Sequence, residues 1–210
     1  NGEVNIATDS ITVENNLIEE SSWHGIRLDG AAVSITNNTI SNNDSSGIYV
    51  NNNSIATITA STISNNGGNG IHIRNTSTAT IENNIAISNN GNHGINIQDS
   101  TATIANNPIS DNGQYGIYAA NSTLDITGNT ITGNTTGAMW LDGTTYFNSM
   151  TGGHALSGNT VSGNGYDFIL IGGTLSADAI WGVGSSPYVV ENLTVAAGVT
   201  LTIDAGVVVK

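Results

Sequence analysis

The chain has 210 residues, 38% of them hydrophobic and only 9% charged, and its 16 acidic and 3 basic residues give a net charge of −13. This balance repels a phosphate backbone and offers no cluster of Lys and Arg to an anionic membrane, which argues against nucleic acid and membrane partners. No apolar run approaches the roughly 20 residues of a membrane-spanning helix, and the absence of cysteine excludes disulfides and thiolate metal sites.

A short phrase, Gly-Ile-x-Ile with close variants, recurs along most of the chain. Its copies begin at Gly25, Gly47, Gly70, Gly94, Gly116 and Gly137. These glycines are 22, 23, 24, 22 and 21 positions apart, and a period in this range indicates a solenoid of stacked coils. Because the alternation within each phrase has a period of two, it predicts a strand with one buried face.

Two more elements follow in each repeat. A second alternating strand precedes an Asn-rich turn, at 33–36, 56–59, 79–82, 102–105 and 124–127. A third inward position follows the Asn pair, at Ile18, Ile40, Ile63, Ile87, Ile109, Ile131 and Val161. Three short strands cannot bury their apolar faces alone, but stacked coils can. We therefore predict an interior column of Ile26, Ile48, Ile71, Ile95 and Ile117, which follow the repeat glycines.

The asparagines form two columns when the repeats are aligned. The first contains Asn16, Asn38, Asn84, Asn107, Asn129 and Asn159, with Ser61 between its second and third members. The second contains Asn43, Asn66, Asn90, Asn112, Asn134 and Asn164. Asn tolerates the left-handed backbone of a sharp corner, and its amide can bond to the coils above and below. We expect structural Asn ladders.

This repeat resembles the right-handed parallel β-helix family over residues 10 to about 170. That family contains carbohydrate-binding and sugar-hydrolysing proteins, pectate lyases and periplasmic copper-loading factors. The resemblance implies an all-β, right-handed, single-stranded parallel β-helix with about seven coils of 21–24 residues. It leaves the function open, because one fold carries many activities.

The pattern divides the chain into two parts. Residues 1–171 carry the repeats, with an inserted loop at about 142–155, because Gly137 and the equivalent Asp167 stand 30 positions apart. Tyr146, Phe147 and His154 lie on this expected loop. Residues 172–210 have short alternating strands without the Asn pair, and they resemble the start of a further β-helical module in large bacterial surface proteins.

One column of outward residues is the candidate ligand-binding surface. It contains Arg27, Tyr49, His72, Asn96, Tyr118 and Met139, with His24, His93 and Tyr115 nearby. Aromatic and polar groups in line on a flat sheet can stack against sugar rings, and Asn96 is expected to face water. The alternative is that these are scattered surface aromatics without a ligand.

No catalytic motif of the resembled families is present. Their lyases use an acidic calcium cluster with an Arg or Lys base, and their pectin hydrolases use Asp clusters with Gly-His-Gly and Arg-Ile-Lys phrases. Asp99 and Asp142 share a corner column about 10 Å apart, but the asparagines of that column, such as Asn121, indicate turn residues. The four histidines lie on separate coils, so neither a metal nor a cofactor is expected.

The leading expectation is a non-enzymatic structural or adhesive element of an extracellular surface protein or filament. The chain starts at Asn1 without a signal peptide, which favours a mature or excised segment, and its strand-like ends predict end-to-end self-association. One alternative is a carbohydrate-binding or carbohydrate-active module with a glycan as its partner. Another is an ice-binding solenoid, suggested by the row of Ser34, Thr57, Thr80 and Thr103 that Asp125 interrupts.

Overall fold

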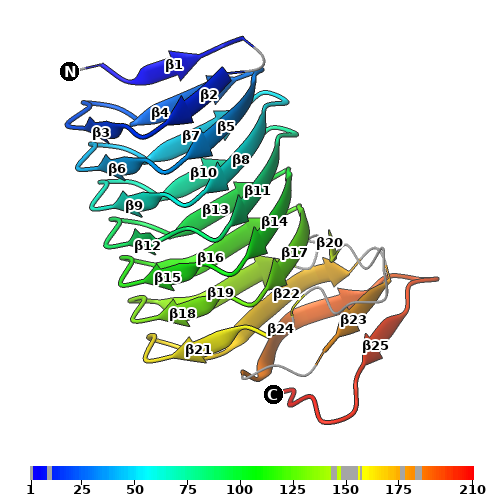
Figure 1. The fold of residues 1–210 in the computed structure, drawn as a ribbon. Coiled ribbons are helices and arrows are strands. Elements are labelled where there is room, and N and C mark those ends of the chain that lie inside the picture. Colours follow the sequence, from blue (N-terminus) through cyan, green and yellow to red (C-terminus); the bar gives the residue numbers. More distant parts are fainter. Residues whose placement is uncertain are drawn as a thin grey trace.

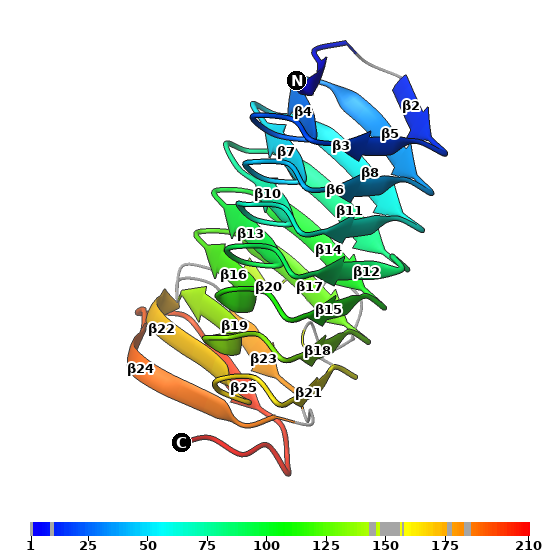
Figure 2. The same cartoon turned by 90° about the vertical axis from the view of Figure 1, so that its left-hand side faces the viewer.

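The computed structural model describes residues 2–8, 11–142, 146–147, 156, 158–175, 178–182 and 186–210, with the backbone alone for 146–147. These residues form an elongated rod of stacked coils, in which successive coils add one strand to each of three parallel sheets (Figure 1). Figure 2 shows the same stack after a quarter turn, with the short third-sheet strands along one wall. No helix long and apolar enough to cross a membrane occurs in this part of the chain.

The three sheets contain nine, seven and seven of the described strands. The first sheet is β1 (Val4–Ile6), β4 (Ile26–Asp29), β7 (Ile48–Asn51), β10 (Ile71–Ile73), β13 (Ile95–Gln98), β16 (Tyr115–Ala120), β19 (Gly137–Asp142), β22 (Ile169–Leu175) and β24 (Tyr188–Val195). The second is β2 (Ile11–Glu14), β5 (Ala32–Thr36), β8 (Ile55–Thr59), β11 (Thr78–Glu82), β14 (Thr101–Ala105), β17 (Thr123–Thr127) and β20 (Tyr146–Phe147). The third is β3 (Leu17–Glu19), β6 (Thr39–Ser41), β9 (Thr62–Ser64), β12 (Ala86–Ser88), β15 (Pro108–Ser110), β18 (Thr130–Thr132) and β21 (Thr160–Ser162). A two-stranded sheet pairs β23 (Ala179–Trp181) with β25 (Leu201–Ile203).

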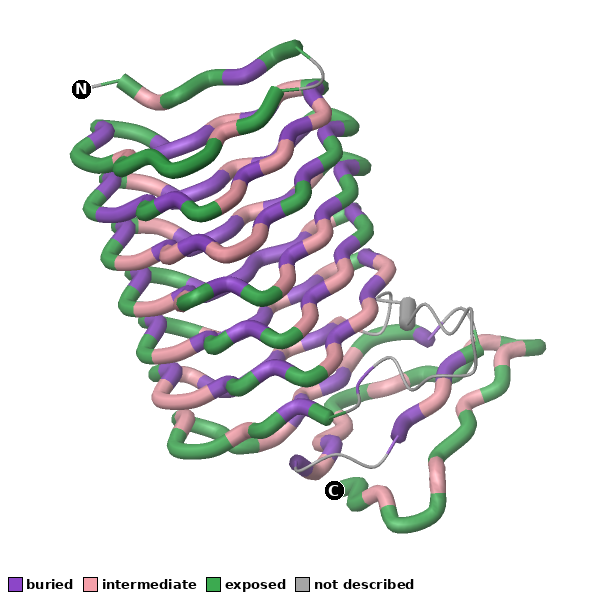
Figure 3. Tube along the Cα trace, viewed as in Figure 1, coloured by how far each residue is buried: buried purple, intermediate pink, exposed green. Residues whose placement is uncertain are grey.

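The predicted interior column is confirmed. Ile71 pairs with Ile48 on one side and with Ile95 on the other, and all three are 0% exposed. Figure 3 shows buried positions alternating with intermediate or exposed ones along most strands of the stack. Because full burial of such a side chain is worth roughly 1.5–3 kcal/mol, the interior columns hold the coils together.

The Asn ladders are also confirmed, and each corner pair divides two tasks between its members. Asn106 takes the left-handed backbone, with φ of 54°, and the next residue, Asn107, makes the ladder contacts. Asn107 accepts from the Asn84 amide at 2.9 Å and donates to Asn129 at 3.0 Å and to the Ile81 carbonyl at 2.9 Å. One side chain therefore joins its own coil to both neighbours, and it is 1% exposed.

A serine ladder, which the sequence analysis did not predict, lines the corner between the first and second sheets. Each hydroxyl oxygen accepts from the backbone N–H of the preceding coil: Ser54 from Ala31 at 3.1 Å, Ser77 from Ser54 at 3.2 Å, and Ser100 from Ser77 at 3.3 Å. Ser122 continues the series by accepting from Ser100. Buried backbone donors at this corner are thus satisfied without asparagine.

The first sheet runs through the expected division at residue 171. β22 crosses that position, and β24 pairs with it in parallel as the ninth strand. That residues 172–210 begin a further module stays a prediction. Within the expected inserted loop, β20 pairs with β17 as a strand of the second sheet. His154 and the segments 143–145 and 148–155 of that loop lie outside the described residues.

Candidate functional site

The outer face of the first sheet differs in chemistry from the other two outer faces. In register, its outward positions are Arg27, Tyr49, His72, Asn96, Tyr118 and Trp140. The outward positions of the second and third sheets carry mainly small residues, such as Thr80 and Thr103, or Ser88 and Ser110. Large aromatic, cationic and amide side chains are therefore concentrated on one face of the rod.

The predicted place of Met139 in this column is wrong. Met139 pairs with Ile117 and is 1% exposed, so it belongs to the interior column, and Trp140 pairs with Tyr118 on the outer face. The repeat glycine Gly116 corresponds to Ala138, because Gly137 pairs with Tyr115. A one-residue change of register turns every side chain of a strand to the opposite face.

A first ring cluster occupies the N-terminal half of the face. His24 stacks on Tyr49, with ring centroids 4.4 Å apart and planes at 10°. His72 contacts the same tyrosine edge-on at 5.2 Å and 81°. Trp23 lies 5.5 Å from His24 and is 56% exposed, so this cluster ends in a large accessible ring.

A second ring cluster occupies the C-terminal half. Tyr118 lies between two parallel rings, with His93 at 4.7 Å and 21° and Trp140 at 4.6 Å and 11°. Tyr115 stacks on His93 at 5.9 Å. The ring faces of this cluster are directed at one another, so a sugar would meet mainly the ring edges, with the tyrosine hydroxyls and imidazole nitrogens, rather than a row of open faces.

The histidines of the two clusters have lowered pKa values, which favours their neutral form at neutral pH. Burial lowers the pKa of His72 to about 4, and the nearby charge of Arg74 acts in the same direction. Burial also lowers the pKa of His93 to about 4, and burial together with Arg27 lowers the pKa of His24. Burial raises the pKa of Tyr118, with Asp142 as a second cause. The face thus presents neutral donors and acceptors, which suit sugar hydroxyls.

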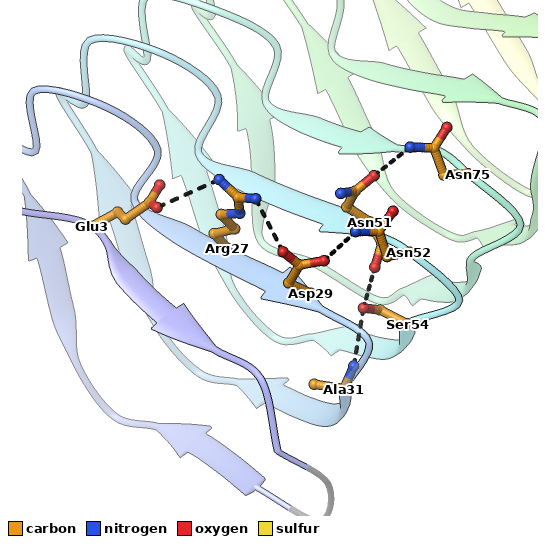
Figure 4. A network of polar contacts seen from close by, with 8 residues as sticks. All are labelled: Glu3, Arg27, Asp29, Ala31, Asn51, Asn52, Ser54 and Asn75. Atoms are coloured by element: carbon orange, nitrogen blue, oxygen red, sulfur yellow. Dashed lines mark hydrogen bonds and ion pairs between the residues drawn. The ribbon is translucent and has the colours of Figure 1, made fainter.

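Arg27 is held in a network at the N-terminal end of this face (Figure 4). Its Nη2 donates to Asp29 at 3.0 Å, and its Nη1 lies 4.0 Å from Glu3. The guanidinium carbon also lies 5.9 Å from the ring centroid of Tyr49. Asn52 of the next coil donates to the same Asp29 carboxylate. The charge of Arg27 is therefore balanced within the protein.

The centre of the face, between the two ring clusters, is polar. Asn96 is 8% exposed, so the expectation that it faces water is wrong. It lies between the larger His72 and Tyr118 on strands about 4.8 Å to either side, and such neighbours cover a short side chain. The described atoms of this face that are buried without a hydrogen-bond partner include Asn96 Oδ1, His72 Nε2 and Arg74 Nε, and at the N-terminal end also Arg27 Nε.

The carboxylates of Asp99 and Asp142 flank Asn121, as their corner column predicts. The Asn121 amide donates to Asp99 at 2.5 Å, and its backbone N–H donates to Asp142 at 3.0 Å. A shallow hollow of about 260 Å³ beside Asp99 is lined by Thr76, Ser77, Ser100, Thr101, Asn121 and Thr123. In the part of the chain that the structure describes, no group of three or more His, Cys, Asp or Glu residues is placed to hold a metal ion. The bonding of both carboxylates to one asparagine is typical of turn residues.

The stacked coils, three parallel sheets and polar ladders define a parallel β-helix. The family model described as a right-handed β-helix region matches residues 3–152, and the chain belongs to that family. Among solved structures, the A-module of mannuronan C-5 epimerase AlgE6 from Azotobacter vinelandii is similar, with a TM-score of 0.63 and 16% identity over 96% of this chain. The match covers 58% of that module's chain, and at this identity it shows the fold alone. No curated protein matches the sequence.

Proposed function

We propose that this chain is a carbohydrate-binding β-helix module and that the outer face of its first sheet binds the glycan. One observation carries the proposal: six successive strands align Arg27, Tyr49, His72, Asn96, Tyr118 and Trp140 on one face. The other two outer faces carry mainly serine and threonine. The similarity to a module of an epimerase named for a polysaccharide, mannuronan, supports the same class of ligand.

The physical basis is a rigid, neutral surface. Rings that already stack on one another lose little side-chain freedom when a ligand binds, so less of the interaction energy is spent on ordering them. Tyrosine and tryptophan combine an apolar body with a polar tip, which suits the mixed apolar and hydroxyl surface of a sugar. The low pKa values of His72 and His93 keep their imidazoles neutral. Nδ1 of His93 already accepts from the backbone N–H of Tyr115, so its Nε2–H is the group that can donate to a sugar hydroxyl.

The other expectations from the sequence stay predictions. Neither the fold nor the comparisons favour a structural or adhesive role, so the proposal follows the carbohydrate alternative. The extracellular location is part of that proposal, since polysaccharides are displayed outside cells. The absence of enzymatic activity also stays a prediction. It is checked by incubating the chain with mannuronan and pectate, where unsaturated or epimerised products would show a carbohydrate-active enzyme instead.

The binding test compares two faces of the same rod. Neutral and acidic oligosaccharides are screened by glycan array, and calorimetry measures the affinity of those retained. We expect Trp140→Ala to weaken binding roughly tenfold, as truncation of an aromatic contact costs more than 1 kcal/mol. Thr103→Ala on the second sheet is the matched control and should leave the affinity unchanged. Equal effects of both variants at unchanged melting temperature, or no retained glycan, would contradict the proposal.

A further inference from the structure

We infer that Arg74 is an anion-binding centre in the middle of this face, and that the ligand is a largely neutral glycan carrying an isolated carboxylate. This inference rests on the proposed function and names the ligand class. The chain has only two arginines, Arg27 on β4 and Arg74 directly after the end of β10, and their surroundings differ. Arg27 is paired with Asp29 and Glu3. Arg74 makes no side-chain hydrogen bond or ion pair with any described residue. The Nε atoms of both arginines are buried without a partner, so the two differ in the ion pairs that the Nη groups of Arg27 make.

The surroundings of Arg74 point to a missing partner. His72 lies on the same outward face two residues earlier, and Asn96 pairs with it in register from the next strand. His72 Nε2 and Asn96 Oδ1 are buried without hydrogen-bond partners. The whole of Asn96 is more than nine-tenths buried, so water has little access to it. Burying an unpaired polar group costs about 1–3 kcal/mol, so three such groups on neighbouring strands need an explanation. A ligand that bonds to this group of side chains supplies one.

The chemistry of the guanidinium selects the ligand group. Its planar fork of N–H donors matches a carboxylate with two parallel hydrogen bonds, and charged pairs of this kind are the stronger ones. Gln98 directly follows Ile97, the strand partner of Ile73, and therefore stands next to Arg74 on the neighbouring coil. The group of Arg74, His72, Asn96 and Gln98 therefore offers one cation among neutral donors and acceptors, as a sugar with one carboxylate requires.

The charges around Arg74 argue against a ligand with a carboxylate on every sugar. Asp29 stands two strands away and Asp142 three strands away on the same outer face, roughly 10 and 14 Å at ordinary strand spacing. Glu191 extends the same outward row beyond Asp142 through Gly172. With a net charge of −13 in addition, a fully charged polymer laid along this face meets repulsion on both sides of the single free arginine.

The two arginines allow a direct test by NMR with an internal control. An ¹⁵N spectrum of arginine Nε–H groups contains two side-chain signals, assigned with Arg27→Gln and Arg74→Gln. We expect sodium glucuronate to shift the Arg74 signal and leave the Arg27 signal unchanged, while glucose and sodium acetate shift neither at the same concentration. Shifts of both arginines together, or an equal response to acetate, would overturn the inference.

Affinity measurements separate this inference from the proposed function. A xylo-oligosaccharide with one glucuronate branch should bind about tenfold more tightly than the unbranched chain, and Arg74→Gln should remove that difference while leaving the melting temperature unchanged. Oligomannuronate of equal length should bind more weakly than the branched chain at 0.01 M salt. At this salt concentration screening is weak, and charges repel one another over about 30 Å. Equal binding of branched and unbranched chains overturns the role of Arg74 alone. If glucuronate shifts the Arg74 signal but Trp140→Ala leaves the glycan affinity unchanged, the proposed glycan face is overturned instead.

Discussion

At the corners of the coils, neighbouring asparagines have different roles. The first of each pair supplies a left-handed backbone, as at Asn83 and Asn106, and the second supplies the amide that joins three coils. Either requirement alone would favour asparagine, which explains why the pair recurs. Gly128 replaces the first member before Asn129, because glycine adopts the same backbone without the amide.

Replacing Asn107 with leucine tests the ladder. The Ile81 carbonyl and the amides of Asn84 and Asn129 would lose their partner in a buried corner, so we expect destabilisation of at least about 2 kcal/mol. Asn96→Leu is the matched control, because it exchanges the same groups where Oδ1 has no partner, and it should change stability by less than about 1 kcal/mol. Urea unfolding followed by circular dichroism measures both, and equal losses would contradict the ladder.

The buried histidines predict a pH dependence. The folded-state pKa values of His72 and His93 are about 4, whereas an unfolded histidine titrates near 6.5. Between these values the unfolded chain binds more protons, so stability is full above about pH 6.5 and falls as the pH drops toward 4. We expect the melting temperature to decrease between pH 6.5 and 5, above the range where most carboxylates titrate.

The variant His72→Gln should flatten part of this decrease, because it removes one of the groups that protonates on unfolding. A glutamine retains hydrogen-bonding capacity at the same place on the face. A melting temperature that does not change between pH 7 and 5 in the wild-type chain would contradict the neutral, buried state of both imidazoles.

At the scale of the element, close contact between coils restricts the repeat glycines. A Cβ added at Gly94 would lie 2.7 Å from the Gly116 carbonyl oxygen and 2.7 Å from a methyl group of Ile109. We therefore expect Gly94→Ala to destabilise the chain by about 1–3 kcal/mol, the usual range for overpacking. Gly2→Ala is the control, since nothing lies within 4 Å of its added Cβ. Thermal unfolding of the two variants would differ by several degrees, and similar midpoints would show that the corner can relax.

At the scale of the whole molecule, the edges of the sheets at the N-terminal end favour association. Among the described strands, β1, β2 and β3 each have a pairing partner on one side only, and Leu17 on β3 is 63% exposed. Exposed edges of this kind template pairing with another chain. We predict that the 210-residue chain self-associates end to end, and that sedimentation velocity shows larger species as its concentration rises.

Two charge substitutions, one at the sheet edge and one on the wall of the rod, test whether association is end to end. Leu17→Glu should reduce association, because it places a charge on the edge itself. Ile55→Glu should not, although Ile55 is 56% exposed, because β8 is paired on both sides and its side chain lies on the wall of the rod. A monomer at every concentration, or an equal effect of the two substitutions, would contradict end-to-end contact.

The sequence by itself determined the three-stranded structure of each coil, because patterns among nearby residues specify its strands and corners. The alternation around Ile71 and Ile81 and the paired asparagines depend on residues a few positions apart, and the glycine period repeats them along the chain. The strands and Asn ladders that these patterns predict were found. Stacking then follows from the need to bury the apolar faces, so the interior column and the Asn ladders could be predicted without coordinates. Most of the outward column of the candidate site could be predicted for the same reason.

Only the tertiary structure decided which surface groups are satisfied and which are free. Trp140 rather than Met139 lies on the outer face because of the hydrogen-bonded register between β16 and β19. The repeat around Gly137 departs from the Gly-Ile-x-Ile phrase, so its sequence does not specify this register. The ring stacks, the burial of Asn96 and the contrast between paired Arg27 and unpaired Arg74 depend on side chains from successive coils. Residues about 22 positions apart meet there on strands about 4.8 Å apart. The pattern within one coil does not predict how closely such side chains pack or which of them form hydrogen bonds.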